Sequence, residues 1–149
     1  MTVLALDPSG TGETGYFLFK DCYDWQIGSI TGKNAAEHGK NIDFLLKKEQ
    51  VEILIWETGI KNVKWANRHW KELTRLDGII TYLKEINNLA GFSVLNRTLE
   101  RNWEIPGLVN QNKKWLFKGQ VVNVHQRDAL LIFFIGWTTF LKRPWPWML

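Results

Sequence analysis

Acidic side chains follow two apolar stretches of the sequence that read as buried strands. Asp7 ends the stretch TVLALD, and Glu57 ends the stretch VEILIWE. Because ligands of open α/β sheets bind beyond the carboxyl ends of the strands, two such carboxylates on neighbouring strands would emerge at one edge. Nearer the C-terminus, His125 and Asp128 stand three residues apart and therefore share one face of a predicted helix. We expect these four side chains to converge on one site.

Such a cluster suits metal-assisted chemistry on phosphate esters. Carboxylates brought together repel one another unless a cation lies between them, and oxygen-rich sites favour Mg²⁺ or Mn²⁺. Two such ions roughly 4 Å apart can activate a water molecule and stabilise the leaving 3′ oxygen of a phosphodiester. Asp7 ends what we expect to be the central strand, so it is the predicted bridging ligand.

Each of these residues also has a plain structural interpretation. Aspartate often follows a strand as a turn residue, and Glu57 could simply face solvent. His125 could be an ordinary helix residue, and Asp128 could lie near a helix N-terminus, where negative charge is favourable. The functional interpretation therefore depends on the joint pattern, which is much less expected by chance than any single member.

The elements that must position these residues can be predicted from apolar periodicity. Strands are expected at residues 2–7, 16–20 and 23–30, forming an antiparallel meander, and again at 51–57 and 92–96. Helices are expected at 34–48, 63–88 and 121–141. Residues 97–118 look irregular, with Pro106 and Gly107 marking a break. This order predicts an α/β fold, a mixed five-stranded sheet flanked by helices, in a single domain spanning residues 1–149.

Basic residues are concentrated in two segments of the chain. The formal net charge is +4, yet residues 61–75 carry five basic side chains against one acidic, and residues 97–118 carry five against two. This separation from a slightly acidic remainder indicates a polyanionic partner, although a solvated helix face explains each segment equally simply. The predicted DNA-binding residues are Lys61, Lys64, Arg68, Arg97, Arg101, Lys113, Lys114 and Lys118.

Tryptophan is abundant, with nine residues in the chain. Ordinary packing is the simpler expectation for most of them. Four nevertheless stand close to basic residues, where an indole could stack on a base or wedge a DNA junction. These four are Trp65, Trp70, Trp103 and Trp115.

The sequence also carries a prediction of compartment. The lone cysteine, Cys22, cannot form an internal disulfide, which fits a reducing cytoplasm. The opening TVLALD reads as a strand and not as a signal peptide, and the longest apolar run, residues 129–141, is too short to span a bilayer. We expect a cytoplasmic protein without a membrane partner, located in the host cytoplasm if it is phage-encoded.

Several stretches resemble, in the right order, the family of RuvC-type Holliday junction resolvases. LALDPSGTGETGYFLF is similar to the family's first strand, loop and second strand, with Asp-Pro followed by Thr-Gly-Tyr. ILIWE resembles the strand that ends in a catalytic Glu, LTRLDGIITYLKE the next helix, and HQRDALLIFF the last catalytic helix. The chain departs from the family in the order Ser9-Gly10, in its shorter length and in the segment after Glu57.

The resemblance implies a ribonuclease H-like fold and an endodeoxyribonuclease that depends on Mg²⁺ or Mn²⁺, with two ions per active site. It assigns catalytic and metal-binding roles to Asp7, Glu57, His125 and Asp128, the histidine taking a position that is Asp in some members. It further implies a homodimer that cuts opposed strands of a four-way DNA junction. The helix around residues 66–87 would supply much of the dimer contact, and the two basic segments would hold the junction arms.

Two alternatives are compatible with the same residues. One is another nuclease of this fold, such as a phage terminase nuclease or a nuclease that processes ribosomal RNA. The other is a non-catalytic nucleic-acid-binding domain, against which the retained acids argue, because an idle site has no reason to keep clustered carboxylates.

Overall fold

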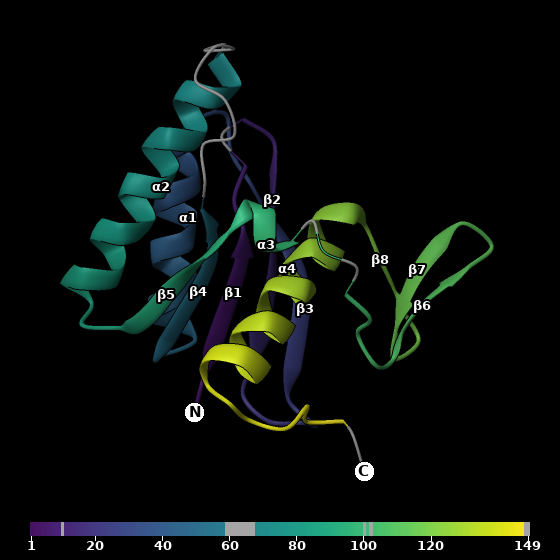
Figure 1. Ribbon diagram of the computed structural model, residues 1–149. Coiled ribbons are helices and arrows are strands. Elements are labelled where there is room, and N and C mark those ends of the chain that lie inside the picture. The colour runs from purple at the N-terminus through teal and green to yellow at the C-terminus, as the bar shows by residue number, and fades with distance from the viewer. Residues whose placement is uncertain (10, 59–67, 100, 102, 148–149) are drawn as a thin grey trace.

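A computed structural model of the chain describes residues 1–9, 11–58, 68–99, 101 and 103–147. A five-stranded sheet of strand order β3-β2-β1-β4-β5 forms its centre, and a three-stranded sheet has the order β6-β7-β8. Helices lie on both faces of the larger sheet (Figure 1). The elements are β1 Val3–Asp7, β2 Glu13–Phe19, β3 Trp25–Thr31, α1 Ala35–Lys48, β4 Ile53–Thr58, α2 Arg68–Ile86, β5 Ala90–Leu95, α3 Asn96–Leu99, β6 Leu108–Gln111, β7 Lys114–Phe117, β8 Gln120–Val122, α4 Val124–Ile135 and a π-helical segment Gly136–Phe140.

The strand β1 is the centre of the large sheet. All of its residues are buried, as its unbroken apolar run predicts. It pairs antiparallel with β2 and parallel with β4. The strands β2 and β3 are also antiparallel, and β4 and β5 are parallel. The predicted mixed five-stranded sheet, with its first three strands antiparallel, is confirmed.

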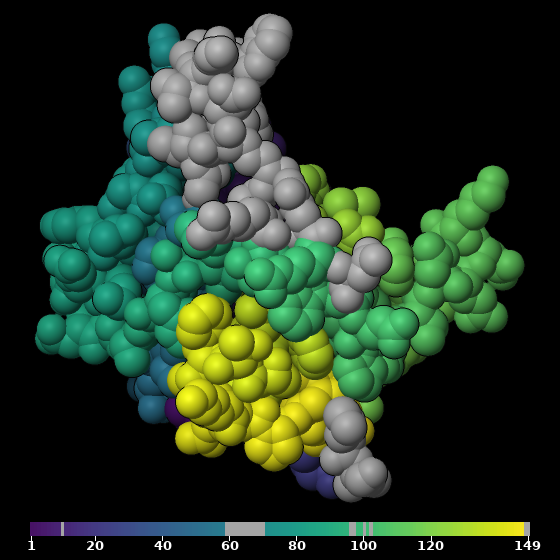
Figure 2. All heavy atoms as spheres, viewed as in Figure 1, coloured from purple at the N-terminus to yellow at the C-terminus, as the bar shows by residue number. Residues whose placement is uncertain are grey.

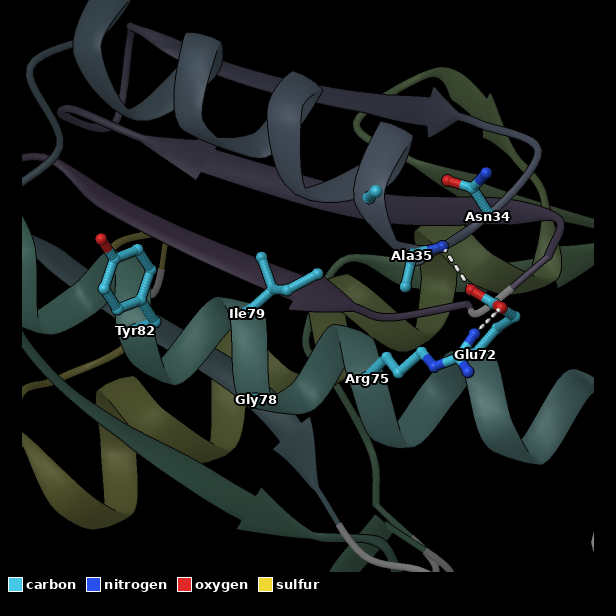
Figure 3. A pocket seen from close by; sticks show the side chains of 8 residues that line it. Asn34, Ala35, Glu72, Arg75, Gly78, Ile79 and Tyr82 are labelled. Carbon is cyan, nitrogen blue, oxygen red and sulfur yellow. Dashed lines mark hydrogen bonds and ion pairs between the residues drawn. The ribbon is translucent and has the colours of Figure 1, made fainter.

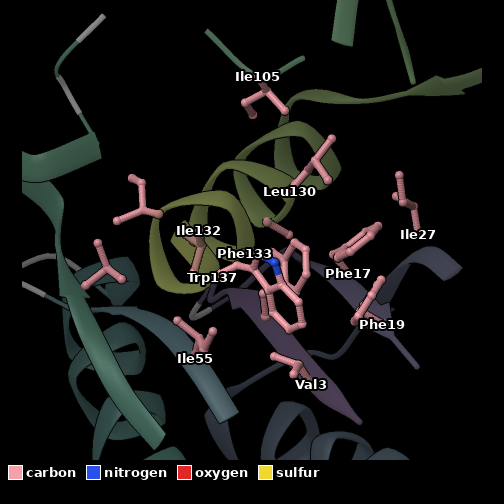
Figure 4. Packing of buried hydrophobic residues seen from close by; sticks show 14 of the residues in the cluster. Val3, Phe17, Phe19, Ile27, Ile55, Ile105, Leu130, Ile132, Phe133 and Trp137 are labelled. Atoms are coloured by element: carbon pink, nitrogen blue, oxygen red, sulfur yellow. The ribbon is translucent and has the colours of Figure 1, made fainter. Parts of the chain in front are cut away.

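Alternating side chains along β1 divide the apolar core into two layers. Val3 and Ala5 belong to the cluster beneath α4, whereas Leu4 and Leu6 belong to the cluster beneath α1 and α2. Figure 4 shows the first of these layers, in which ring centroids of Phe17 and Phe133 lie 4.7 Å apart. Each large apolar side chain buried here contributes about 1.5–3 kcal/mol to stability, so the two layers together hold β1 and β4 in place.

The helices α1 and α2 are joined by polar contacts where α1 begins. Asn34 caps α1, its side chain accepting from the backbone N–H of Glu37. The backbone N–H of Ala35 donates to the Glu72 carboxylate of α2 over 2.8 Å, and Arg75 pairs with the same carboxylate at 2.7 Å (Figure 3). These bonds help hold both helices on the same face of the sheet.

The prediction that residues 97–118 are irregular is wrong. The segment contains the hairpin of β6 and β7, and β7 pairs in turn with β8. Both connections are two-residue turns with positive φ, at 53° and 64° for Asn112 and Lys113 and at 48° and 83° for Lys118 and Gly119. Such turns match the twist of a hairpin but usually carry glycine in their second position. The β6–β7 turn has Lys113 there, so the sequence does not show the usual signal of a hairpin. The hairpin extends away from the large sheet (Figures 1 and 2).

The final helix is shorter than predicted. Residues 121 and 122, predicted as the start of this helix, belong instead to β8, because they pair with β7. The helix α4 starts after Asn123, which forms a reciprocal capping box with Gln126, and π-helical geometry follows from Gly136 to Phe140. Across the described ranges, neither α4 nor any other helix is long and apolar enough to cross a membrane.

Three C-terminal tryptophans have a structural role. Trp137, Trp145 and Trp147 pack in or against the aromatic core around Phe133 and Phe17. Each indole N–H donates to a backbone carbonyl, at 2.7, 3.1 and 3.0 Å respectively. For these three residues the packing interpretation is therefore confirmed.

Candidate active site

The carboxylates of Asp7 and Glu57 lie at the same edge of the sheet. The parallel register places Leu6 of β1 opposite Trp56 of β4, so the next residue of each strand reaches that edge. Asp7 is only 8% exposed. Burial raises its pKa to about 9, reinforced by a hydrogen bond with Glu57 and by the negative charges of Glu57 and Asp128. Burial therefore favours the protonated form of Asp7 in the metal-free protein.

The helix α4 brings the second pair of predicted residues to this edge. His125, in its first turn, places Nδ1 3.3 Å from Oδ2 of Asp7. This approach requires Gly15 of β2, since a Cβ there would lie 2.2 Å from the backbone oxygen of His125. Any side chain at position 15 would thus force α4 away from the sheet. The glycine of the Thr-Gly-Tyr motif is therefore explained by packing as well as by the resemblance to the resolvase family.

A polar network fixes the start of α4 against β2 and β3. The Asn123 amide donates to the Glu13 carboxylate over 2.6 Å, and the Ser29 hydroxyl donates to the same carboxylate. Gln126 donates to the Ser29 hydroxyl over 3.0 Å. Glu13 thereby gains two hydrogen-bond donors, which lower its pKa. The network holds the first turn of α4, and with it His125, at the edge of the sheet.

Asp128 is held by its neighbour Arg127. The guanidinium donates to Oδ1 of Asp128 from Nε over 3.1 Å and from Nη2 over 2.9 Å. The same guanidinium lies 5.2 Å from the ring centroid of Trp115 in β7. Arg127 was not among the predicted site residues. Its position between the two predicted helix ligands was the available signal.

The donor set at this edge fits a hard divalent cation. Asp7, Glu57 and Asp128 would supply carboxylate oxygens, and His125 would supply an imidazole nitrogen. The pKa of Asp7 is raised first by burial and further by the neighbouring carboxylates, whose charge a cation would balance. Among the described residues, however, no group of three His, Cys, Asp or Glu side chains is already arranged to hold a metal ion. In the metal-free protein, Asp7 is hydrogen-bonded with Glu57 and Asp128 is bonded to Arg127, so these carboxylates already have partners. Metal binding would therefore require side-chain rearrangement.

The loop after β1 rests on a buried histidine that the sequence did not single out. The backbone N–H of Ser9 donates to Oγ1 of Thr14 over 3.0 Å, and that oxygen lies 3.1 Å from Nδ1 of His38. His38 is fully buried, and burial lowers its pKa. A neutral imidazole thus supports the loop that follows Asp7.

The predicted DNA-binding residues divide between described and undescribed positions. Lys61 and Lys64 lie outside the described residues. Arg68 begins α2 and Arg97 lies in α3, and their side chains are likewise outside the described part. The remaining four are exposed, at or near the three-stranded sheet: Arg101, Lys113, Lys114 and Lys118.

Two cavities lie beside the helices that flank the large sheet. One of about 520 Å³ lies between α1 and α2, lined by Ile79 and Tyr82 among others, and includes none of the four predicted site residues (Figure 3). The other, of about 960 Å³, lies between α4, the segment after α3 and the hairpin, and it borders Asp128. The second cavity is therefore the one continuous with the candidate site.

The strand order, the antiparallel start of the sheet and the helices on both faces define a ribonuclease H-like fold. The chain is similar in structure to RuvC of Thermus thermophilus, with a TM-score of 0.61 over 95% of this chain and 97% of that one at 14% identity. It is equally similar to T. thermophilus RuvC in complex with a Holliday junction substrate, with a TM-score of 0.61 over 93% and 96% at 13% identity. No protein-family model matches the sequence, and no curated protein matches it. The resemblance drawn from the sequence is thus confirmed at the level of the fold.

Proposed function

We propose that this protein is a divalent-metal-dependent endodeoxyribonuclease that resolves four-way DNA junctions. The observation that carries the proposal is the meeting of Asp7, Glu57, His125 and Asp128 at one sheet edge. The full-length likeness to the RuvC fold supports the choice of substrate.

The four residues have distinct proposed roles. Asp7, Glu57 and Asp128 would bind Mg²⁺ or Mn²⁺, two ions per site, which when bound supply an activated water and stabilise the leaving oxygen. Asp7 must first give up the proton that burial favours. Arg127 positions Asp128 through its two hydrogen bonds. His125 either completes the ligand set or accepts a proton from the attacking water.

DNA binding is assigned to the predicted basic residues. Arg101 is exposed and lines the cavity that borders Asp128, and Lys113, Lys114 and Lys118 are exposed in the three-stranded sheet and its turns. Lys61, Lys64, Arg68 and Arg97 are proposed on sequence grounds alone. Cutting two opposed strands requires two active sites, so we propose a homodimer. The exposed side chains of Tyr82 and Ile86 make α2 a suitable contact surface for a second copy.

A cleavage assay tests the proposed function. The protein is incubated with a synthetic four-way junction, a linear duplex of the same sequence and a structured RNA, each with Mg²⁺, with Mn²⁺ or with EDTA. We expect paired nicks in opposed junction strands, only when a metal is present, and none with Asp7→Asn. Preferential cutting of duplex or RNA would identify another nuclease of this fold. Junction binding without cleavage in either metal would identify a binding domain and refute the proposal.

A further inference from the structure

The cavity beside Asp128 has the composition of a nucleobase site. Its volume of about 960 Å³ lies at the upper end of the range for small-ligand sites. Aromatic, cationic and carboxylate side chains line it together with apolar ones. Those used below are Arg101, Trp103, Glu104, Trp115, Arg127 and Asp128.

Two planar surfaces are fixed in the wall of this cavity. The Trp103 indole donates to the backbone oxygen of Thr98 over 2.7 Å and packs edge-on against Phe134. The Trp115 indole carries the Arg127 guanidinium on its face at 5.2 Å. Unpaired bases stack on both aromatic rings and guanidinium planes, so a base entering the cavity would find such a surface already formed.

Polar groups in the same wall could bind the edge of a base. The Glu104 carboxylate can accept from an exocyclic amino group, and the Arg101 guanidinium can donate to a carbonyl or ring nitrogen. Arg101 is exposed, and Glu104 is also accessible at the mouth of the cavity. The wall thus combines stacking with hydrogen-bonding groups, whereas a phosphate site would need only positive charge.

The position of the cavity relates it to the strand that is cut. Asp128 belongs both to the cavity wall and to the proposed metal site. A phosphodiester at that site would therefore have a neighbouring nucleotide at the mouth of the cavity. Within a duplex a base presents only its edges, so stacking here requires a base that has left its pair, which costs least where pairing is already disturbed.

We propose that this cavity binds one unpaired nucleobase of the scissile strand, stacked on the Arg127–Trp115 pair. The inference rests on the proposed function and deepens it. A branch point supplies such a base, whereas an intact linear duplex must be opened first. The cavity would in this way favour branched over linear DNA.

Fluorescence of 2-aminopurine tests the proposal without requiring cleavage. The base analogue is placed in turn at the two nucleotides on either side of the branch point, and wild-type protein is added in EDTA. We expect a change in emission at one position, lost in Trp115→Ala and retained in Trp115→Phe. Tyr23→Ala is the control, because Tyr23 is 94% exposed in the β2–β3 connection, at the opposite end of the sheet from Asp7.

An abasic nucleotide at the responding position provides the second measurement. Wild-type protein should bind the abasic junction about tenfold more weakly than the intact junction, as expected for the loss of one base stack. In Trp115→Ala the same abasic change should have little further effect, because both changes remove the same stacking interaction. If Trp115→Ala does not fold, the abasic junction with the wild-type protein still tests the stack, because it removes the base instead of the ring.

Two results would overturn the cavity assignment. One is that adding protein changes the 2-aminopurine emission at none of the labelled positions. The other is that wild type binds every abasic junction as tightly as the intact junction. Either result, combined with metal-dependent junction cleavage, rejects the base site and leaves the proposed function intact. A positive fluorescence result without cleavage in any metal would instead support base binding and reject the nuclease.

Discussion

Replacing Asp7 with asparagine separates the proposed metal-binding role of this side chain from its effect on folding. Burial raises the pKa of Asp7 from 3.8 to about 9, so the folded protein keeps a proton that the unfolded chain releases above about pH 4. The stability of the metal-free protein must therefore fall as the pH rises through this window. At 1.36 kcal/mol per pH unit, the loss between pH 5 and pH 8 is at most about 4 kcal/mol. Asparagine cannot titrate, so the variant should escape this loss.

Urea unfolding in EDTA at pH 5 and pH 8 measures the effect. We expect wild type to lose stability at the higher pH and Asp7→Asn to lose much less, while Glu85→Gln, which alters an exposed carboxylate of α2, behaves as wild type. Mg²⁺ at 100 times its Kd should then stabilise wild type by about 2.7 kcal/mol at pH 8 and leave Asp7→Asn unchanged. Equal pH dependence, or equal stabilisation by Mg²⁺, in wild type and Asp7→Asn would refute the assignment of Asp7.

Four further outcomes are expected. His125→Asp should keep substantial cleavage activity, because a carboxylate restores a hard ligand beside Asp7, whereas His125→Ala should be severely impaired; equal rates for both, at matched folded concentration, would show that His125 touches no metal. Gly15→Ala should cost about 1–3 kcal/mol in urea unfolding and reduce cleavage, since its Cβ would meet the backbone of His125 at 2.2 Å, and a variant as stable as wild type would contradict that packing. Burial lowers the pKa of His38, so stability in the Asp7→Asn background should fall as the pH drops below about 6.5, and His38→Gln should abolish that decline. Neutralising the hairpin lysines Lys113, Lys114 and Lys118 should flatten the slope of log affinity against log salt by about 0.9 for each phosphate contact that is lost. The same change at Lys33, Lys40 and Lys48, three exposed lysines in or beside α1, should leave the slope unchanged.

The large sheet could be predicted because its strands are unbroken apolar runs. β1 and β4 are buried almost throughout, and such runs between turn residues have few other interpretations. The small sheet could not be predicted in the same way. Its strands have only three or four residues each, and its first turn places Lys113 at a φ of 64°, where glycine is the usual signal. Short strands with an unusual turn residue thus resembled an irregular basic loop.

The candidate site was predictable where it depends on strand ends and helix spacing. The strand ends predicted Asp7 and Glu57, and the three-residue helix spacing predicted His125 and Asp128. Arg127 was missed, because its role arises from contacts with Asp128 and with Trp115, a residue twelve positions away in another element. The start of α4 was missed for a different reason. Asn123 with Gln126 is a recognisable capping box, but the apolar residues before it continue the helical pattern and hid the boundary.

The candidate site combines two strands that the core holds in place with a helix that also contacts the hairpin. This difference relates substrate binding to the metal site. Asp7 and Glu57 stand on strands flanked by apolar layers on both faces, so their backbone positions depend on the core and not on the hairpin. Arg127 instead bonds to Asp128 on one side and stacks on Trp115 of the hairpin on the other. Movement of the hairpin would therefore alter the surroundings of Asp128 while leaving the two strand carboxylates where they are. If DNA binds the hairpin and the adjacent cavity as proposed, the Arg127 contact is where binding and the completion of the metal site become linked.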